Sequence, residues 1–213
     1  MVIILSDSNN NIPTFEEIKA AIKKATKAAV EELFAIGEDF YYLVLATSGD
    51  TRLTPYLCAC STEGLAQTVK KYIEEYGYDP NESSLEESLR WSSADSPYAY
   101  YGYDKHFKDL ENLYTQSWTA IDDNDHDMWE QERVFHSNAI ILALKELDDE
   151  GVFERKIKRK HLFINIAPDH LNVKSTAYIL NDNELFEKAM NDNILEDVAE
   201  WKMDAIGNLH VKD

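Results

Sequence analysis

The stretch FYYLVLATSGD (residues 40–50), followed by PYLCACS (residues 55–61), decides the fold of this chain. The first segment is rich in β-branched and aromatic residues that favour strands, Ser-Gly-Asp after it is typical of a turn, and the second segment is interpreted as the returning strand. We therefore expect two antiparallel strands. Cys58 and Cys60 lie two residues apart in the second strand, so both side chains face one side of the sheet. They are too close in sequence for an easy disulfide, and buried free thiols fit a reducing cytoplasm.

Helical patterns surround this strand pair. Thr14 and Glu17 have the spacing of a capping box, and apolar residues then recur at helical spacing up to Gly37. A second helix is expected to begin at Ser61 or Thr62. That helix should end near Gly77, and a loop-rich stretch over 78–102 with a short helical piece around 86–89 follows it. Beyond this stretch we expect helices over about 104–118 and 127–149, a third strand over 160–167 and an acidic helix from Asn183 to about Met203.

Strands and helices are mixed without strict alternation, which predicts an α+β fold with a mainly antiparallel sheet packed against several helices. The length of 213 residues and a hydrophobic content of 44% are sufficient for one domain with a full core. We expect residues 1–213 to form that single domain, with residues 193–213 as an acidic helical C-terminal extension.

Charge restricts the partners of this protein. The chain has 40 acidic residues against 21 lysines and arginines, a formal net charge of −19. Such a charge repels nucleic acid and anionic membranes and would attract a basic protein, although it can also serve solubility alone. The apolar opening Met1–Leu5 is too short for a signal peptide, and no stretch approaches the roughly 20 apolar residues of a membrane span. We expect a cytoplasmic protein that binds neither nucleic acid nor membrane.

The common catalytic and cofactor motifs do not occur. The sequence lacks a phosphate-binding loop, a dinucleotide fingerprint, a zinc-protease motif and a nucleophile elbow. A calcium loop beginning at Asp123 fails because Met128 and Val134 stand where Gly and Glu are needed. Glu132 and His136 are four residues apart on one helix, a weak acid–base signal that is more typical of a surface or boundary residue. We therefore predict no catalytic residues, no metal and no cofactor.

A basic run, RKIKRK over residues 155–160, contains five of the 21 basic residues. Such a run can bind phosphate groups. In an acidic chain it more often guards a hairpin rim or an edge strand, and it could also pair with the acidic tail.

The strongest candidate for a binding site is the segment RWSSADSPYAYYGY (residues 90–103), which is unusually aromatic for a stretch rich in turn-forming residues. Trp and Tyr have a large apolar body and a polar tip, so they either fasten a long loop to the core or line a recognition surface. Both interpretations remain open. The candidate binding residues are Arg90, Trp91, Asp95, Tyr98, Tyr100, Tyr101 and Tyr103.

Several segments resemble the bacterial family called domain of unknown function 4303. They are residues 42–47, 57–65, 89–98, 143–153 and 175–181, which fall in the order that this family shows, and Arg-Trp-Ser-x-Ala-Asp at residues 90–95 is the most specific element. The resemblance covers about residues 14–192. The Tyr-rich continuation after Tyr98 and the tail beyond Asp192 depart from the pattern.

The resemblance implies a single-domain cytoplasmic protein, similar in style to the immunity proteins encoded beside secreted bacterial toxins. It implies no activity and no residue roles. An acidic immunity-type protein could neutralise a basic toxin by covering its phosphate-binding surface with carboxylates. The expected function is therefore non-enzymatic protein binding. The alternative is a small-molecule-binding or hydrolytic enzyme that uses the Trp91 loop in its site.

Overall fold

The computed structural model describes residues 12–47, 54–79, 83–119, 126–154, 159–168, 172–196, 201–203 and 209–211. Its centre is a four-stranded sheet in the order β3-β2-β1-β4. The strands are β1 (Phe40–Thr47), β2 (Tyr56–Ser61), β3 (Tyr98–Tyr101) and β4 (Phe163–Pro168). The predicted pair is present, because β1 and β2 run antiparallel with Leu43 opposite Ala59. β4 pairs with β1 in parallel, with Val44 opposite Asn165, so the sheet is mainly but not wholly antiparallel.

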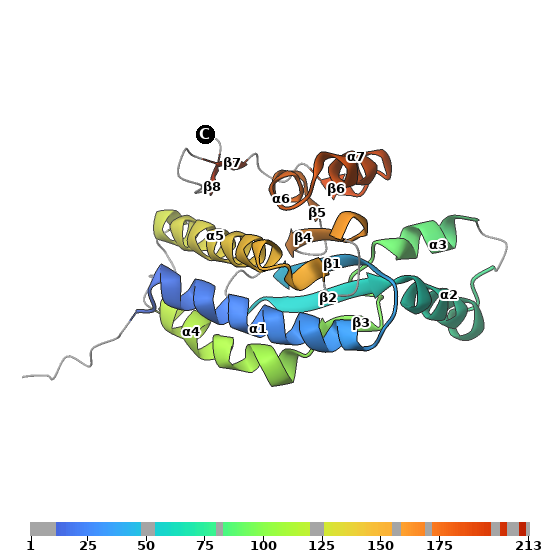
Figure 1. Cartoon of the computed structure of the whole chain (residues 1–213), viewed down its shortest axis with the longest axis horizontal. Helices are drawn as coiled ribbons and strands as arrows, with labels where there is room; N and C mark the ends of the chain where they lie inside the picture. The colour runs from blue at the N-terminus through green and yellow to red at the C-terminus, as the bar shows by residue number, and fades with distance from the viewer. Residues whose placement is uncertain are drawn as a thin grey trace, which may run out of the picture.

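Helices cover both faces of this sheet (Figure 1). One face carries α1 (Phe15–Ala35), α4 (Lys108–Thr119) and α5 (His126–Asp149), and the other carries α6 (Lys174–Leu180) and α7 (Asn183–Asn191). The remaining helical elements are α2 (Thr62–Tyr76), α3 (Ser83–Arg90), the π-helical turn Tyr103–Phe107 and the 3-10 turns Val152–Glu154 and Arg159–His161. The predicted α+β class and single domain are confirmed.

The alternation of side chains along the central strands divides the core in two. Leu43 and Leu45 of β1 face the larger cluster, which is built with α1, α4 and α5. Tyr42 and Val44 face the smaller cluster on the side of α6 and α7. Every residue of β2 is buried, since the sheet is covered on both sides.

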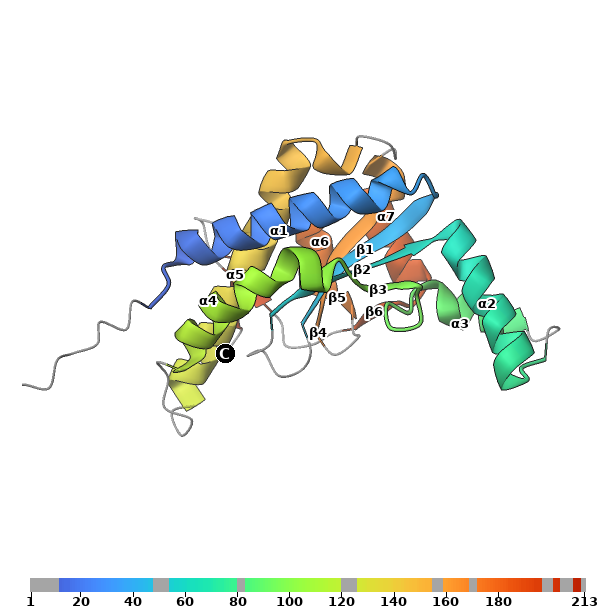
Figure 2. The same cartoon turned by 90° about the horizontal axis from the view of Figure 1, so that it is seen from below.

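The helix pair α2–α3 stands apart from these layers. Figure 2 shows the two helices beyond one end of the sheet, away from α1, α4 and α5. The pair has a small core of its own, formed by Leu65, Leu85 and Leu89 and bordered by Val69 and Ile73.

Local capping signals gave correct helix starts. Thr14 caps α1 in the predicted capping box, in which the Thr14 amide donates to Glu17 at 2.8 Å and the Glu17 amide donates to Thr14 Oγ1 at 3.3 Å. Ser61 caps α2, and its Oγ accepts from the Gly64 amide at 2.9 Å. Gly77 ends α2 in the left-handed conformation (φ 75°), which glycine adopts at little cost.

One prediction was wrong and another was incomplete. The acidic tail is not one helix, because α7 ends at Asn191 and Asn193 takes a left-handed conformation (φ 59°) that stops it. Three short strands follow: β6 (Leu195–Glu196), paired in parallel with β5 (Asn172–Val173), and the antiparallel strands β7 (Trp201–Met203) and β8 (Leu209–Val211). The segment 78–102 is also more regular than predicted, since Ser83–Arg90 is helical and Tyr98–Tyr101 adds an edge strand to β2.

The basic run and the proposed calcium loop are described only in part. Residues 155–158 and Asp123 and Asp125 lie outside the described residues. Arg159 is described, and its Nε donates to Asp148 Oδ1 at 2.8 Å while its Nη atoms donate to the carbonyls of Leu162 (2.7 Å) and Leu180 (2.5 Å). Arg159 therefore links α5 to α6 and to Leu162, the residue that precedes β4.

Both cysteines are buried on the face of the smaller cluster, at 1% and 4% exposure. Burial raises the pKa of the Cys58 thiol to about 11 and that of Cys60 to about 12. Since only the thiolate is an efficient nucleophile, we expect both thiols to resist iodoacetamide in the native protein at pH 8 and to react once it is unfolded in guanidinium. Mass spectrometry after a timed reaction measures this, and rapid labelling of the native protein would contradict the burial.

Candidate functional site

Trp91 fastens the predicted binding segment to the sheet. Its ring meets Tyr41 and Tyr42 of β1 edge to face, with centroid distances of 5.6 Å in each case, and Phe163 of β4 at 6.0 Å. These rings belong to the smaller core cluster or pack against it. Such aromatic pairs add to the apolar burial itself, so Trp91 holds the segment in place.

Asp95 holds the turn that follows. Its Oδ1 accepts from the Tyr72 hydroxyl at 2.6 Å and its Oδ2 from the Ser92 hydroxyl at 2.5 Å. The hydrogen bond to Asp95 raises the pKa of Tyr72 to about 12. The Asp95 carbonyl accepts from Thr68 Oγ1 at 3.2 Å, so this residue connects the segment to α2.

Arg90 stands at the junction between α3 and this segment. Its Nη2 lies 2.7 Å from Glu86 Oε1, and its guanidinium carbon lies 5.7 Å from the centre of the Tyr41 ring. The Arg90 carbonyl accepts from the Tyr41 hydroxyl at 2.6 Å. Burial raises the pKa of Tyr41 above its usual range, so this hydroxyl remains a donor at neutral pH.

The four candidate tyrosines are divided between the two faces of the sheet. Tyr98 and Tyr101 pack against the larger cluster, on the opposite face of the sheet. The Tyr103 hydroxyl donates to Glu111 at 2.7 Å, and Tyr103 contacts both clusters. Tyr100 alone is well exposed, at 57%, and it stacks on Tyr56 at 4.0 Å. The structure thus brings Arg90, Trp91 and Asp95 together and places Tyr98 and Tyr101 on the other face of the sheet.

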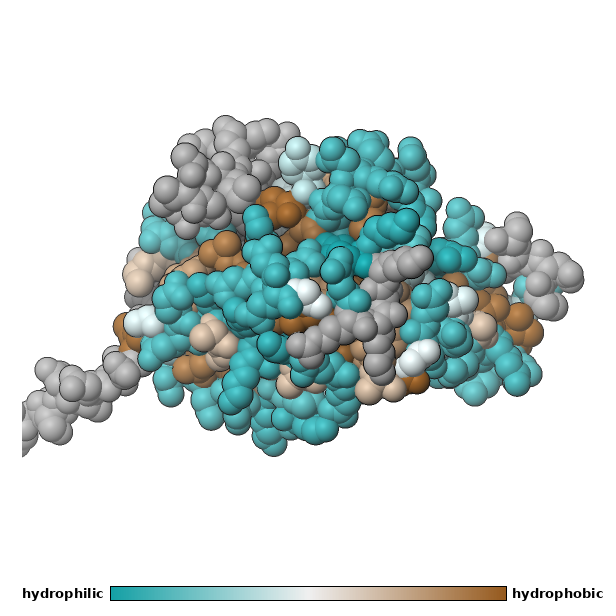
Figure 3. Space-filling model, in the orientation of Figure 1, coloured by the Kyte–Doolittle hydropathy of each residue, from teal (hydrophilic) through white to brown (hydrophobic). Residues whose placement is uncertain are grey.

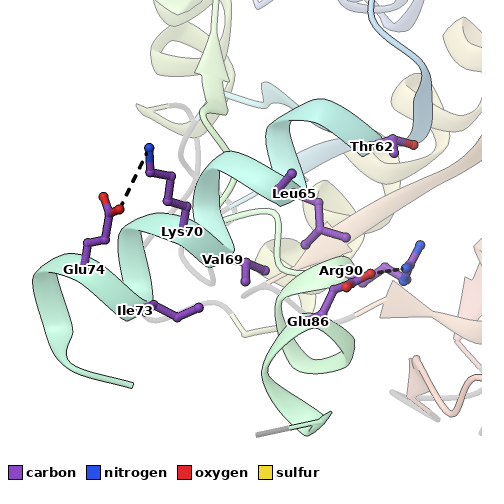
Figure 4. A pocket seen from close by; sticks show the side chains of 9 residues that line it. Thr62, Leu65, Val69, Lys70, Ile73, Glu74, Glu86 and Arg90 are labelled. Carbon is purple, nitrogen blue, oxygen red and sulfur yellow. Dashed lines mark hydrogen bonds and ion pairs between the residues drawn. The ribbon is translucent and has the colours of Figure 1, made fainter. Parts of the chain in front are cut away.

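A groove that the sequence did not predict lies between α2 and α3. Its volume is about 580 Å³, within the range of ligand-binding sites. Its lining residues are Thr62, Leu65, Ala66, Val69, Lys70, Ile73, Glu74, Glu86 and Arg90. Figure 4 shows Leu65 and Val69 pointing from α2 toward α3. In Figure 3 apolar surface appears over this helix pair, whereas most of the same face is hydrophilic.

The charged residues of this groove lie at its rim. Lys70 and Glu74 approach to 3.9 Å on α2, and Arg90 pairs with Glu86 on α3 (Figure 4). Exposed ion pairs of this kind contribute little to stability. The main feature of the groove is its apolar floor.

An aromatic cluster continues from the groove past the end of α2. Tyr76 and Tyr78 are 57% and 44% exposed, and their ring centroids lie 5.1 and 5.3 Å from that of Tyr72. Tyrosine is enriched among the residues that dominate the binding energy of protein interfaces. The groove and this cluster therefore form one apolar and aromatic surface on α2–α3.

His136 is buried at 3% exposure, contrary to the prediction of a surface or boundary residue. Its ring stacks on Trp118 at 5.5 Å and lies 4.2 Å from Tyr114, and its Nε2 is 3.0 Å from Glu132 Oε1. Burial acts to raise the pKa of Glu132, but its contacts with His136 and the Ser117 hydroxyl outweigh burial and lower that pKa. Because aromatic rings surround His136, the described residues leave no open path by which a substrate could reach it.

The described ranges contain neither a cluster of metal ligands nor a membrane-spanning helix. Within those ranges no three acidic, histidine or cysteine side chains gather in the manner of a metal site. Among the same residues no helix has the length and apolar character needed to cross a bilayer.

The chain belongs to the family described as "Domain of unknown function (DUF4303)". The family model matches residues 22–182, which include the sheet, the α2–α3 pair and the Trp91 segment. Comparisons with curated proteins and with solved structures found no match.

Proposed function

We propose that this chain is a non-enzymatic protein-binding domain whose α2–α3 groove receives an apolar segment of a basic partner protein. The observation that carries the proposal is the groove itself, with its apolar floor of Leu65, Val69 and Ile73. An amphipathic helix commonly binds in such a groove through residues spaced three and four apart.

The arrangement suits recognition better than chemistry. The charged groups at the groove, Lys70, Glu74, Glu86 and Arg90, form two ion pairs at its rim, and neither pair is held in a desolvated pocket. General acid–base catalysis needs a titratable group that points at the bound substrate. Exposed Tyr76 and Tyr78 extend the apolar surface instead, as aromatic anchors do at protein interfaces.

Charge selects the partner. The described residues between 62 and 90 include six acids and three bases, the same sign as the net charge of −19. A basic protein would be drawn to this surface before the apolar contact forms. An immunity-type role, in which a cytoplasmic acidic domain neutralises a basic toxin, combines these features.

The test begins with capture. Immobilised full-length chain is exposed to a lysate of its source at low salt, and each captured protein is purified and its isoelectric point determined. Capture alone does not support the proposal, since acidic proteins retain many weak binders. The supporting result is a basic protein whose association rate falls about tenfold or more between about 50 and 500 mM salt, because exposed charges are screened.

A charge variant provides the control. Glu75→Lys, an exposed change on α2, should reduce the association rate, whereas Glu16→Lys at the remote start of α1 should change it less. Capture of acidic or neutral partners only, or an association rate that stays flat across the salt series, would show that the charge serves solubility.

A further inference from the structure

A second, smaller pocket lies next to the groove. It has a volume of about 110 Å³ and is lined by Tyr41, Thr62, Arg90, Trp91, His161, Phe163, Leu185, Lys188 and Ala189. Thr62 and Arg90 line both hollows, so the two are neighbours. We call it the Trp91 pocket.

The chemistry of the Trp91 pocket differs from that of the rest of the chain. Its charged lining groups are basic, from Arg90 and Lys188, with the imidazole of His161 beside them, and the nine described lining residues include no acid. This occurs in a chain with almost twice as many acids as lysines and arginines. The three groups come from different elements, the end of α3, the turn Arg159–His161 and α7, so the fold brings them together.

The cationic side chains that line the Trp91 pocket differ in whether they already have an acidic partner. Arg90 gives one Nη to Glu86 at 2.7 Å, and a guanidinium has further donors to offer. Among the described residues the side chains of Lys188 and His161 have no hydrogen-bond or ion-pair partner that competes for a ligand. Acids of α7 such as Glu184 and Glu187 are exposed and do not line the pocket.

The walls strengthen the attraction. Tyr41, Trp91 and Phe163 form an aromatic side, and Leu185 and Ala189 are buried. His161 and Lys188 are exposed and Arg90 is partly exposed, so these groups reach a bound anion from the rim of the pocket, while the apolar walls shield one side of it from water. The volume is well below the roughly 300–1,000 Å³ of small-molecule sites, so the pocket suits a single functional group.

From this combination we propose that the Trp91 pocket is an oxyanion-binding site that takes one phosphate or carboxylate group, held by Lys188, Arg90 and His161 against Trp91. It is distinct from the apolar groove and does not depend on the function proposed above. The oxyanion is either a free ion or metabolite, or a group on a larger ligand that extends into the groove through the shared edge at Thr62 and Arg90.

The test uses the indole NH signals of the full chain labelled with ¹⁵N-tryptophan. The four tryptophans give four signals, and the Trp91 signal is assigned by its loss in Trp91→Phe. Inorganic phosphate and acetate are titrated separately, with chloride at matched ionic strength as the blank. We expect a saturable shift of the Trp91 signal with a dissociation constant on the order of 1 mM, as for a few charge-assisted hydrogen bonds.

Two variants decide the location. Lys188→Gln should weaken the binding about tenfold. Lys70→Gln, at the groove rim and outside the Trp91 pocket, should leave it unchanged. Saturation by phosphate alone or by acetate alone identifies which oxyanion the pocket prefers, and stronger binding of octanoate than of acetate indicates a ligand that also reaches the groove. A shift that does not saturate, that chloride reproduces, or that Lys188→Gln leaves intact would overturn the proposal.

Discussion

Replacement of Trp91 by alanine is expected to lower the free energy of unfolding by about 3 kcal/mol. The ring contacts Tyr41, Tyr42 and Phe163 edge to face, and its removal would leave a cavity against two central strands. The side chain is only partly buried, so the lower end of the range for a Trp→Ala change in a core applies. The same change would release the turn that Asp95 ties to α2.

Urea denaturation followed by circular dichroism measures this change. Trp91→Phe should recover much of the stability because it keeps an aromatic ring in the same place. Tyr178→Ala is the matched control, since Tyr178 is 62% exposed and should have little effect. If the midpoint of Trp91→Ala equals that of the wild-type chain, the segment is not fastened to the sheet as described.

Local sequence signals predicted the elements that depend on near neighbours. The capping box at Thr14 and the strand-favouring residues of 40–47 with the turn that follows them each act within a few residues, and the structure confirms the capped helix and the antiparallel pair. The parallel pairing of β1 with β4 joins Val44 to Asn165. Nothing local encodes that contact, because it results from the burial of both strands between two helical layers.

The arrangement of the candidate binding residues also depends on contacts that the local sequence does not specify. Sequence reasoning grouped the aromatic residues of 90–103 as one candidate segment, but that segment passes from one core cluster to the other. An irregularity in the pairing of β3 with β2, where Tyr100 has a positive φ of 54°, brings Tyr98 and Tyr101 to the same face. Trp91 consequently packs on one face, and Tyr98 and Tyr101 pack on the other. That division depends on where the strand joins the sheet, which composition does not specify.

Packing between helices that are far apart in the sequence explains two further differences from prediction, the groove and the burial of His136. The sequence predicted a helix from Ser61 or Thr62 to near Gly77, but it did not predict the position of the short helix α3, which leaves Leu65, Val69 and Ile73 lining an open groove. His136 was expected near the surface because its helix neighbours include Glu132. The rings of Tyr114 and Trp118 from α4 enclose it instead.

Replacement of Ile73 by aspartate is expected to weaken binding of the partner by about thirtyfold or more. Ile73 lies in the apolar floor of the α2–α3 groove, where a truncated or polar anchor costs about 2 kcal/mol of binding free energy. An aspartate would also have to lose its hydration beneath an apolar segment. Ile73 is half-buried at the edge of the small α2–α3 core, so the domain should remain folded with a modest loss of stability.

The dissociation constant of the captured partner for Ile73→Asp, compared with wild type and with Tyr178→Asp on the remote helix α6, tests the central claim most directly. Both variants add the same charge, so any difference between them reflects the groove, and circular dichroism confirms that each is folded at the assay temperature. We expect the dissociation constant to rise about thirtyfold or more for Ile73→Asp and to stay near the wild-type value for Tyr178→Asp. A folded Ile73→Asp chain that binds the partner as tightly as Tyr178→Asp would contradict the assignment of the α2–α3 groove as the binding surface.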